Sequence, residues 1–224
     1  MQASVTPFTL YLVSRVFVTL AATMLSVADG WHIYEATGNP FDLALGGLVQ
    51  ILPIAGLFIV SGWVIDNLQR KYVLIACTVL QGLVLLGLAA SLGSDEFDRV
   101  SVFGLLLLMG VARAFYMPAV QAILPGIVPH DGLEKAVAVS STAWTGAGTA
   151  GPFVAGFLIA WLDTNIYLLL AVLTCIAGAL LFYLPAVTVR RPSGRGLAQF
   201  LEGIKYVYKN PLVLPAISLD LFIV

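Results

Sequence analysis

The stretch Gly62-Trp-Val-Ile-Asp66-Asn-Leu-Gln-Arg70-Lys71 joins two long apolar runs, at about 43–65 and about 72–92. Each run has about the 20 residues that a helix needs to cross roughly 30 Å of hydrocarbon. Charged residues occur only in the short segment between the runs, where Gly62 is followed after four positions by Asp66 and after four more by Arg70-Lys71. The pattern predicts a short polar loop between two membrane-spanning helices.

Outward from this loop, four more apolar runs have spanning length, at about 10–34, 100–120, 136–162 and 166–183. A further apolar run covers 212–224, too short to cross, so we expect additional sequence to follow it. Residues 105–109 are apolar on every face, whereas the strands of a membrane barrel alternate apolar and polar residues. The sequence therefore predicts an all-α membrane protein with six spans and the start of a seventh.

The overall composition agrees with a chain that lies mostly in lipid. It is 60% hydrophobic and 10% charged, with a mean hydropathy of +0.98, so too few charged side chains are present to cover a soluble fold. The formal net charge of −1 argues against both a polybasic nucleic-acid binder and an acidic disordered tail. Cys77 and Cys175 lie in apolar runs, which favours packing over a disulfide or a metal site.

The distribution of cations predicts the orientation. With a cytoplasmic N-terminus, eight Lys and Arg residues fall in cytoplasmic loops and only Arg99 falls outside. Cytoplasmic loops are enriched in these residues, so we expect a multi-pass protein of the cell's inner or plasma membrane. The expected organisation is a six-helix bundle at 1–184, a cytoplasmic linker with an amphipathic helix at 185–211, and the start of the next spanning helix at 212–224.

Several motifs resemble the major facilitator superfamily. The Gly62–Lys71 loop is similar to its cytoplasmic loop signature, although Asn67 stands where the family usually has Arg and Gln69 where many members have Gly. The stretches Trp31-His-Ile-Tyr-Glu-Ala-Thr-Gly-Asn-Pro40 and Arg113-Ala-Phe-Tyr-Met-Pro-Ala-Val-Gln-Ala122 resemble its multidrug and siderophore exporter branch, which includes enterobactin exporters and macrolide efflux proteins. Ordinary topology signalling is the alternative explanation of the loop taken alone.

The resemblance implies a twelve-helix transporter made of two six-helix bundles, with substrate bound between them near the middle of the membrane. The chain would supply the N-terminal bundle, and a C-terminal bundle or a second copy would complete it. The loop residues Gly62, Asp66, Arg70 and Lys71 would belong to a conformational switch. Gly62 would allow close helix contact, and Asp66 would accept hydrogen bonds from helix termini or pair with a cation.

The fifth span is rich in small residues. Its stretch Ala147-Gly-Thr-Ala-Gly151-Pro152-Phe-Val-Ala155-Gly156 resembles the superfamily's antiporter signature, with Ala147 and Ala155 in place of glycines. Gly151 and Gly156 would let another helix approach closely, and Pro152 removes a backbone donor and favours a kink. The span is therefore predicted to be either a hinge or a static packing face.

Ionisable residues inside spans are candidates for function, because a charge at the bilayer centre costs at least roughly 2.5–3.5 kcal/mol. Asp29 is the candidate for a proton or a cationic substrate, with simple hydration near the outer surface as the alternative. Arg113 resembles the buried Arg that the superfamily associates with proton coupling, with an interfacial anchor as the alternative. Arg15 is close enough to the cytoplasmic start of its span for its charge to reach the interface.

Polar and aromatic residues in the spans are candidates for the walls of a substrate cavity. Gln50 and Gln81 offer amides, and Tyr116 and Trp144 offer aromatic rings, which would suit a large amphipathic molecule. Trp31 and Tyr34 are better explained as interfacial anchors.

These observations favour a secondary transporter, in particular a proton-driven exporter of a drug or siderophore, with no cofactor beyond the proton gradient. Uptake or lipid flipping on the same scaffold, and a non-transporting half-size subunit, are the alternatives. An enzyme is not expected, because His32 and His130 lie near opposite faces and neither has a second His or Cys at ligand spacing, so no metal site is expected either. A phosphate-binding glycine loop ending in Lys-Ser or Lys-Thr is also absent from the sequence.

Overall fold

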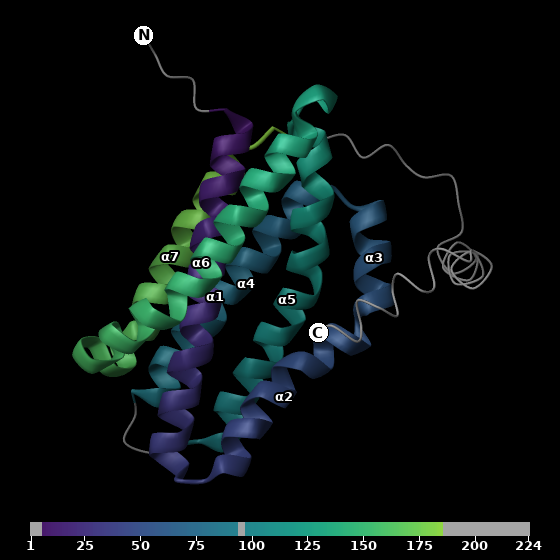
Figure 1. Ribbon diagram of the computed structural model, residues 1–224. Coiled ribbons are helices and arrows are strands. Elements are labelled where there is room, and N and C mark those ends of the chain that lie inside the picture. The colour runs from purple at the N-terminus through teal and green to yellow at the C-terminus, as the bar shows by residue number, and fades with distance from the viewer. Residues whose placement is uncertain (1–5, 94–96, 186–224) are drawn as a thin grey trace, which may run out of the picture. The chain divides into compact units, whose positions relative to one another are not determined.

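A computed structural model describes residues 6–93 and 97–185, and within these ranges every regular element is a helix (Figure 1). The long helices are α1 (Pro7–Thr37), α2 (Pro40–Gly56), α3 (Phe58–Asn67), α4 (Arg70–Leu92), α5 (Arg99–Ile127), α6 (Leu133–Leu162) and α7 (Ile166–Phe182). Short 3₁₀ turns, η1 (His130–Gly132) and η2 (Asp163–Asn165), lie on either side of α6. The predicted fold class is confirmed. The linker and final helix predicted for 185–211 and 212–224 lie, from 186 onward, outside the described residues.

Local sequence explains where α1 ends and α2 begins. Gly38 adopts φ 60°, a left-handed conformation that glycine tolerates, and its N–H donates to the Tyr34 carbonyl at 2.8 Å. Asn39 then caps α2 by accepting a hydrogen bond from the Phe41 N–H at 3.0 Å, and Pro40 occupies the first helical position. The two helices therefore join through a two-residue turn.

Length and hydropathy identify four helical stretches among the described residues that could cross a membrane, or five if α2 and α3 count together. One of the four is the 50-residue run Leu133–Phe182, which at about 1.5 Å per residue is far too long for one crossing of about 30 Å. This run turns at η2, where Asp163 has φ 48°, and α6 and α7 run in opposite directions in Figure 1. Counted as two, these helices bring the total in the described ranges to the six predicted spans.

The second predicted span is not one straight helix. It consists of α2 and α3, which meet at Leu57 with a bend of 53°. Pro53 and Gly56 immediately precede the bend, and these are the two residue types that weaken a helix interior most. The span predicted at about 43–65 is therefore present as two helical segments, and the bend between them was not predicted.

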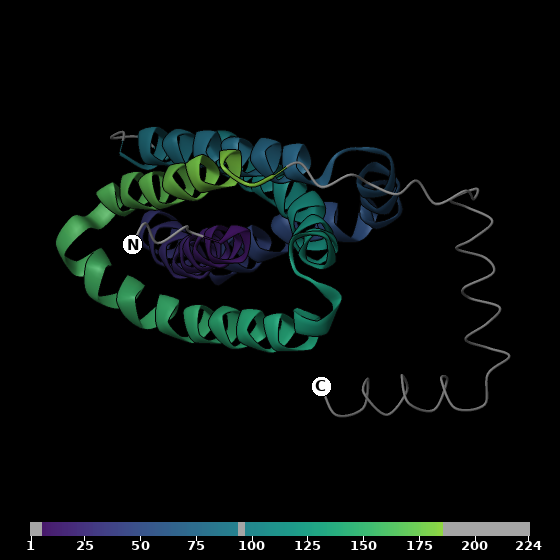
Figure 2. The same ribbon diagram turned by 90° about the horizontal axis from the view of Figure 1, so that it is seen from above.

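The helices pack around α1, which contacts α6 and α7 extensively, and around α4, which contacts α5 and α7. In the view from above, α1 lies inside the curve formed by α6 and α7 (Figure 2). Helix α2 packs against α5, and an ion pair of 2.8 Å between Asp42 and Arg99 joins the starts of these two helices. Each end of the bundle has its own cluster of buried apolar residues.

Asp98 begins α5. Its carboxylate accepts hydrogen bonds from the Ser101 hydroxyl and from the Val100 N–H at 3.0 Å, and these bonds, that of Ser101 first, hold the pKa of Asp98 below its ordinary value.

Candidate functional site

Three polar residues that the sequence singled out separately lie together between α1, α2 and α5. Asp29 of α1 and Gln50 of α2 are 4% and 8% exposed. The Gln50 Nε2 lies 3.5 Å from Asp29 Oδ2 and 3.3 Å from the Gly46 carbonyl, and the Arg113 guanidinium donates to Gln50 Oε1 at 2.8 Å. The Gln50 amide thus links a buried carboxylate to a cation.

A close approach of two backbones makes this link possible. A Cβ atom on Gly110 of α5 would lie 2.4 Å from the Gln50 carbonyl oxygen, closer than real Cβ atoms approach such an atom. Gly110 therefore lets α2 lie directly on α5. Arg113 follows Gly110 by three positions and so lies on the same side of α5, one turn further along, where it reaches Gln50.

Further hydrogen bonds pair some, but not all, of the polar atoms of this cluster. Arg113 also donates to the Ala22 carbonyl at 3.1 Å, while its buried Nε has no hydrogen-bond partner among the described residues. Asp29 interacts with the Tyr167 hydroxyl of α7. Asp29 is buried and Arg113 partly buried, and because an unpaired charge in the bilayer is costly, the opposite charges of these residues offset part of that cost.

Arg15 lies in a second polar cluster, near the start of α1. Its guanidinium donates to the Tyr11 hydroxyl at 3.1 Å and to the Ser140 hydroxyl of α6. The Tyr11 hydroxyl in turn donates to the Val120 carbonyl of α5 at 3.0 Å. Arg15 thus joins α1, α5 and α6 at the end of the bundle where α1 begins.

The four loop residues have different environments. Arg70 donates to the Ala122 carbonyl of α5 at 2.7 Å, and Lys71 donates to the Phe182 carbonyl at the end of α7 at 2.7 Å. These cations therefore hold α4 against the ends of two neighbouring helices. Asp66 is exposed and forms no hydrogen bond or ion pair with the described residues, and a Cβ on Gly62 would meet nothing within 4 Å. The predicted close contact at Gly62 and the predicted pairing of Asp66 do not form within this part of the chain.

Only one face of α6 uses its small residues for close packing. Ala147, Gly151 and Ala155 are buried, and a Cβ on Gly151 would meet the Thr23 side chain of α1 at 1.9 Å. Pro152 and Gly156 are exposed, and a Cβ on Gly156 would meet nothing within 4 Å. The tight packing expected of Gly156 is therefore absent among the described residues, whereas that of Gly151 is present.

Two of the four cavity candidates lie in packed surroundings. Tyr116 is 5% exposed and belongs to the apolar cluster near the start of α1, so it does not line an open cavity. Gln81 is 4% exposed on α4, and its Nε2 has no hydrogen-bond partner among the described residues. Trp144 of α6 is 45% exposed, which is compatible with a cavity wall and with a lipid-facing position, and Gln50 is part of the Asp29 cluster.

Comparisons with known proteins agree with this architecture. The family model of the Major Facilitator Superfamily matches residues 11–224. Macrolide efflux protein A of Streptococcus pyogenes is 26% identical over 186 residues, which cover 82% of this chain and 44% of that protein. Monocarboxylate transporter 11 of Homo sapiens is 26% identical over 157 residues, which cover 64% of this chain and 33% of that protein. The chain spans less than half the length of these relatives.

A solved structure supports the same fold. A peptide transporter in complex with sulfate superposes with a TM-score of 0.63 and 15% sequence identity, over 96% of this chain and 46% of that one. At an identity this low, the similarity shows only the fold. The matched part is about half of the peptide transporter chain.

Proposed function

Since the chain belongs to the major facilitator superfamily, we propose that it forms the N-terminal half of a secondary transporter that exports an amphipathic small molecule, such as a drug or siderophore, in exchange for protons. The observation that carries this proposal is the buried link from Asp29 through Gln50 to Arg113. A carboxylate held next to a cation inside a membrane protein is a site where a proton can be taken up and released.

The proposed mechanism follows from what a proton would change at Asp29. The ionised carboxylate accepts from the Gln50 amide, and its charge offsets that of Arg113. A proton on Asp29 removes that charge and leaves Arg113 without compensation, which favours a rearrangement of α5 or the arrival of another anion. Uptake and release on opposite sides of the membrane would then drive alternating access.

The membrane orientation and the assembly are part of the same proposal. We place the N-terminus in the cytoplasm of a cell bounded by an inner or plasma membrane, because Lys and Arg fall mainly in loops on that side. The substrate would bind between this bundle and a second one, which is either a C-terminal bundle or a second copy of the chain. The proton gradient supplies the energy, so we propose no cofactor and no catalytic activity.

The substrate class is supported by macrolide efflux protein A, because its name states what that relative exports. Trp144 supplies an exposed aromatic ring on α6 that could stack on such a molecule.

The proposal can be tested by replacing Asp29 with Asn, which keeps the size of the side chain and removes its charge. In vesicles with the cytoplasmic face outward, we expect the wild type to accumulate a labelled macrolide when the lumen is acidic. We expect Asp29→Asn to lose this accumulation, because no proton is exchanged.

Asp42→Asn is the matched control, because Asp42 is also a buried aspartate, but it pairs with Arg99 at the start of α5 and not with Gln50. It should retain transport that depends on the pH gradient. The proposal fails if Asp29→Asn transports at the wild-type rate with an unchanged pH dependence.

Carriage of a carboxylate is a second candidate. Arg113 retains an Nε donor without a hydrogen-bond partner among the described residues, and one relative is named monocarboxylate transporter 11. Uptake of labelled lactate by the same vesicles distinguishes drug export from carboxylate transport. Only carboxylate transport predicts that the wild type moves lactate and that Arg113→Gln abolishes this movement.

A further inference from the structure

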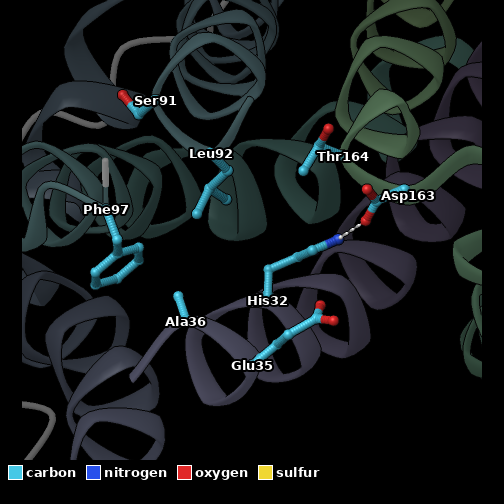
Figure 3. A pocket seen from close by; sticks show the side chains of 8 residues that line it. All are labelled: His32, Glu35, Ala36, Ser91, Leu92, Phe97, Asp163 and Thr164. Atoms are coloured by element: carbon cyan, nitrogen blue, oxygen red, sulfur yellow. Dashed lines mark hydrogen bonds and ion pairs between the residues drawn. The ribbon is translucent and has the colours of Figure 1, made fainter. Parts of the chain in front are cut away.

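A third polar cluster lies at the end of the bundle where α1 finishes and α6 turns into α7. A pocket of about 440 Å³ opens there, and its lining includes His32 and Glu35 of α1, Asp163 and Thr164 of η2, and Ser91 of α4 (Figure 3). The side chains of His32 and Asp163 point toward each other across it. None of the pocket residues belongs to the Asp29–Gln50–Arg113 link.

The orientation of His32 is fixed by its surroundings. Its ring is 5% exposed, and Nδ1 lies 2.9 Å from the Ala28 carbonyl and 3.2 Å from the Tyr167 hydroxyl. A carbonyl oxygen can only accept a hydrogen bond, so Nδ1 carries the proton in that contact. The lone pair of a neutral imidazole is then on Nε2, which faces the pocket. Histidines that bind metals are commonly held in this way by a backbone carbonyl.

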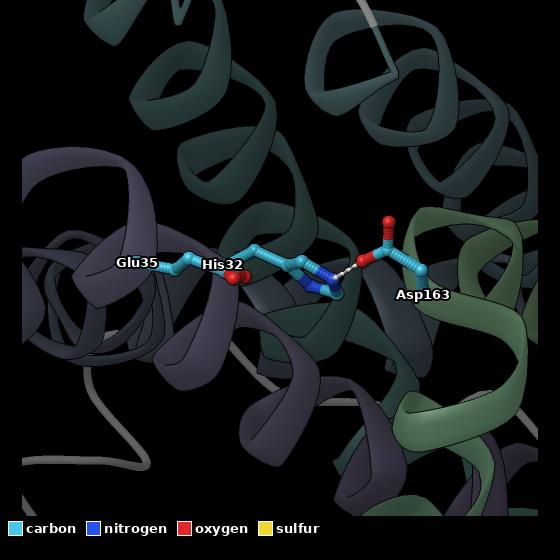
Figure 4. Close-up of side chains that lie close together, drawn as sticks. All are labelled: His32, Glu35 and Asp163. Carbon is cyan, nitrogen blue, oxygen red and sulfur yellow. Dashed lines mark hydrogen bonds and ion pairs between the residues drawn. The ribbon is translucent and has the colours of Figure 1, made fainter.

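The group that Nε2 faces is also an acceptor. Asp163 Oδ1 lies 3.2 Å from Nε2, and the Asp163 side chain is 75% exposed (Figure 4). The lone pair of a neutral ring would repel this carboxylate, so the contact needs either a proton on Nε2, which makes it an ion pair, or a metal ion between the two atoms. Ligand atoms about 2.0–2.2 Å from one tetrahedral ion are themselves about 3.3–3.6 Å apart, so the observed separation is close to that of two ligands of a single metal ion.

Glu35 can supply the third ligand. Its carboxylate, Nε2 of His32 and the carboxylate of Asp163 all lie within 4.8 Å of one another. Glu35 is exposed and forms no hydrogen bond with the described residues, so a change of rotamer can bring its oxygen closer. We propose that His32, Glu35 and Asp163 bind a divalent transition-metal ion in this pocket, with water completing the coordination.

The ligand set indicates the class of ion. One imidazole nitrogen and two carboxylates suit zinc and its first-row neighbours, whereas magnesium and calcium prefer oxygen ligands only. Three protein ligands leave a position open to water or to a further ligand. Because Asp163 belongs to the turn between α6 and α7, the ion would fasten that turn to α1.

Sequence spacing did not predict this site. His32 and Glu35 are three positions apart on one face of a helix, but the third ligand is 131 residues from His32, in a turn whose place in the bundle depends on the packing of α6 and α7.

Zinc binding to the purified protein in lipid nanodiscs tests the proposal. The affinity tag must contain no histidine, and Zn²⁺ is titrated calorimetrically at pH 7.5 with a competing chelator. We expect one ion per chain and a higher melting temperature with Zn²⁺, because binding stabilises the folded state. Glu35→Gln, Asp163→Asn and His32→Gln should each weaken binding by more than the roughly 10–100-fold caused by loss of an outer-shell partner.

Glu35→Gln keeps the test decisive if His32→Gln does not fold, because the exposed Glu35 side chain contributes no hydrogen bond to the described fold. His130→Gln, at the opposite end of α6, is the matched control and should bind Zn²⁺ like the wild type. Absence of Zn²⁺ binding to the wild type would overturn the proposal and would leave His32 and Asp163 as a simple ion pair. Equal binding by the wild type and all three ligand variants, or tighter binding of Mg²⁺ or Ca²⁺ than of Zn²⁺, would overturn it as well.

Discussion

Some glycines of this bundle allow two helices to pack closely. Such a glycine can be recognised by the atoms that an added Cβ would meet, whereas a replaceable glycine has open space there. Gly110 lies against the backbone of Gln50, whereas Gly104, on the same helix, has nothing within 4 Å of a Cβ position. The first contact places Gln50 beside Arg113 and so connects packing with the proposed proton site.

Replacement of Gly110 by Ala should therefore push α2 away from α5. We expect the free energy of unfolding to fall by about 1–3 kcal/mol, as for other overpacked cores, and proton-driven transport to be lost. Thermal unfolding in detergent and vesicle transport measure the two effects. Gly104→Ala is the control, and it should be neutral or stabilise α5 by up to about 1 kcal/mol. A Gly110→Ala protein as stable and active as the control would contradict the assigned contact.

The same residues show what sequence could and could not predict about the site. Asp29 and Arg113 were identifiable because a charge stands out in an apolar run, and Gln50 because it is a polar residue in a similar run. Their convergence was not predictable, since it depends on the approach of α2 to α5 at Gly110, which no local pattern indicates. Tyr116 was misplaced because an aromatic ring suits a core as well as a cavity wall.

Among whole elements, α6 has two different faces. Its buried face carries Ala147, Gly151 and Ala155 at intervals of four residues and packs on α1. A neighbouring face, about 100° further round the helix, carries Pro152 and Gly156, which are exposed in the described structure. Composition showed that this helix is rich in small residues, but only the packing of α1 selects which of them are in contact.

Valine substitutions distinguish the two faces of α6. Gly151→Val should separate α6 from α1, because even its Cβ would collide with Thr23, and we expect a loss of about 1–3 kcal/mol in unfolding free energy. Gly156→Val introduces the same side chain five positions further on and should leave the melting temperature of the isolated bundle nearly unchanged. Equal destabilisation by the two variants would contradict the assignment of faces.

Span boundaries were predictable where turn chemistry is strong and less so elsewhere. Thr37-Gly38-Asn39-Pro40 separates α1 from α2 through a left-handed glycine and a capping asparagine, both of which are recognisable in sequence. The bend between α2 and α3 was missed because hydropathy does not change at Leu57. Apolar composition predicts burial in lipid, but it does not show whether a helix is straight.

For the whole molecule, hydropathy alone predicted the number of membrane-spanning segments. The charges of the loops predicted an orientation in the membrane, which can be tested by labelling. In a variant with Cys77 and Cys175 replaced by Ser, a cysteine at Ala36 should react with a membrane-impermeant maleimide added to intact cells. A cysteine at Asp66 should react only after the membrane is permeabilised. Both native residues are exposed, so the difference reports the side of the membrane. The reversed labelling pattern would contradict the proposed orientation.

The central place of α1 also determines the order in which the molecule can be completed during synthesis. Its hydrogen bonds reach far along the chain, from Ser14 to the Ala177 carbonyl and from Arg15 to Ser140. At about 5–20 residues per second, a ribosome needs roughly 7–26 s to add the 131 residues that separate His32 from Asp163. Throughout that interval the buried polar face of α1 lacks its partners in η2 and α7, and Ser140 of α6 is added only near its end. Until the last helices of the bundle are made, these polar groups need water or other hydrogen-bond partners, because unsatisfied polar groups are costly in the hydrocarbon region.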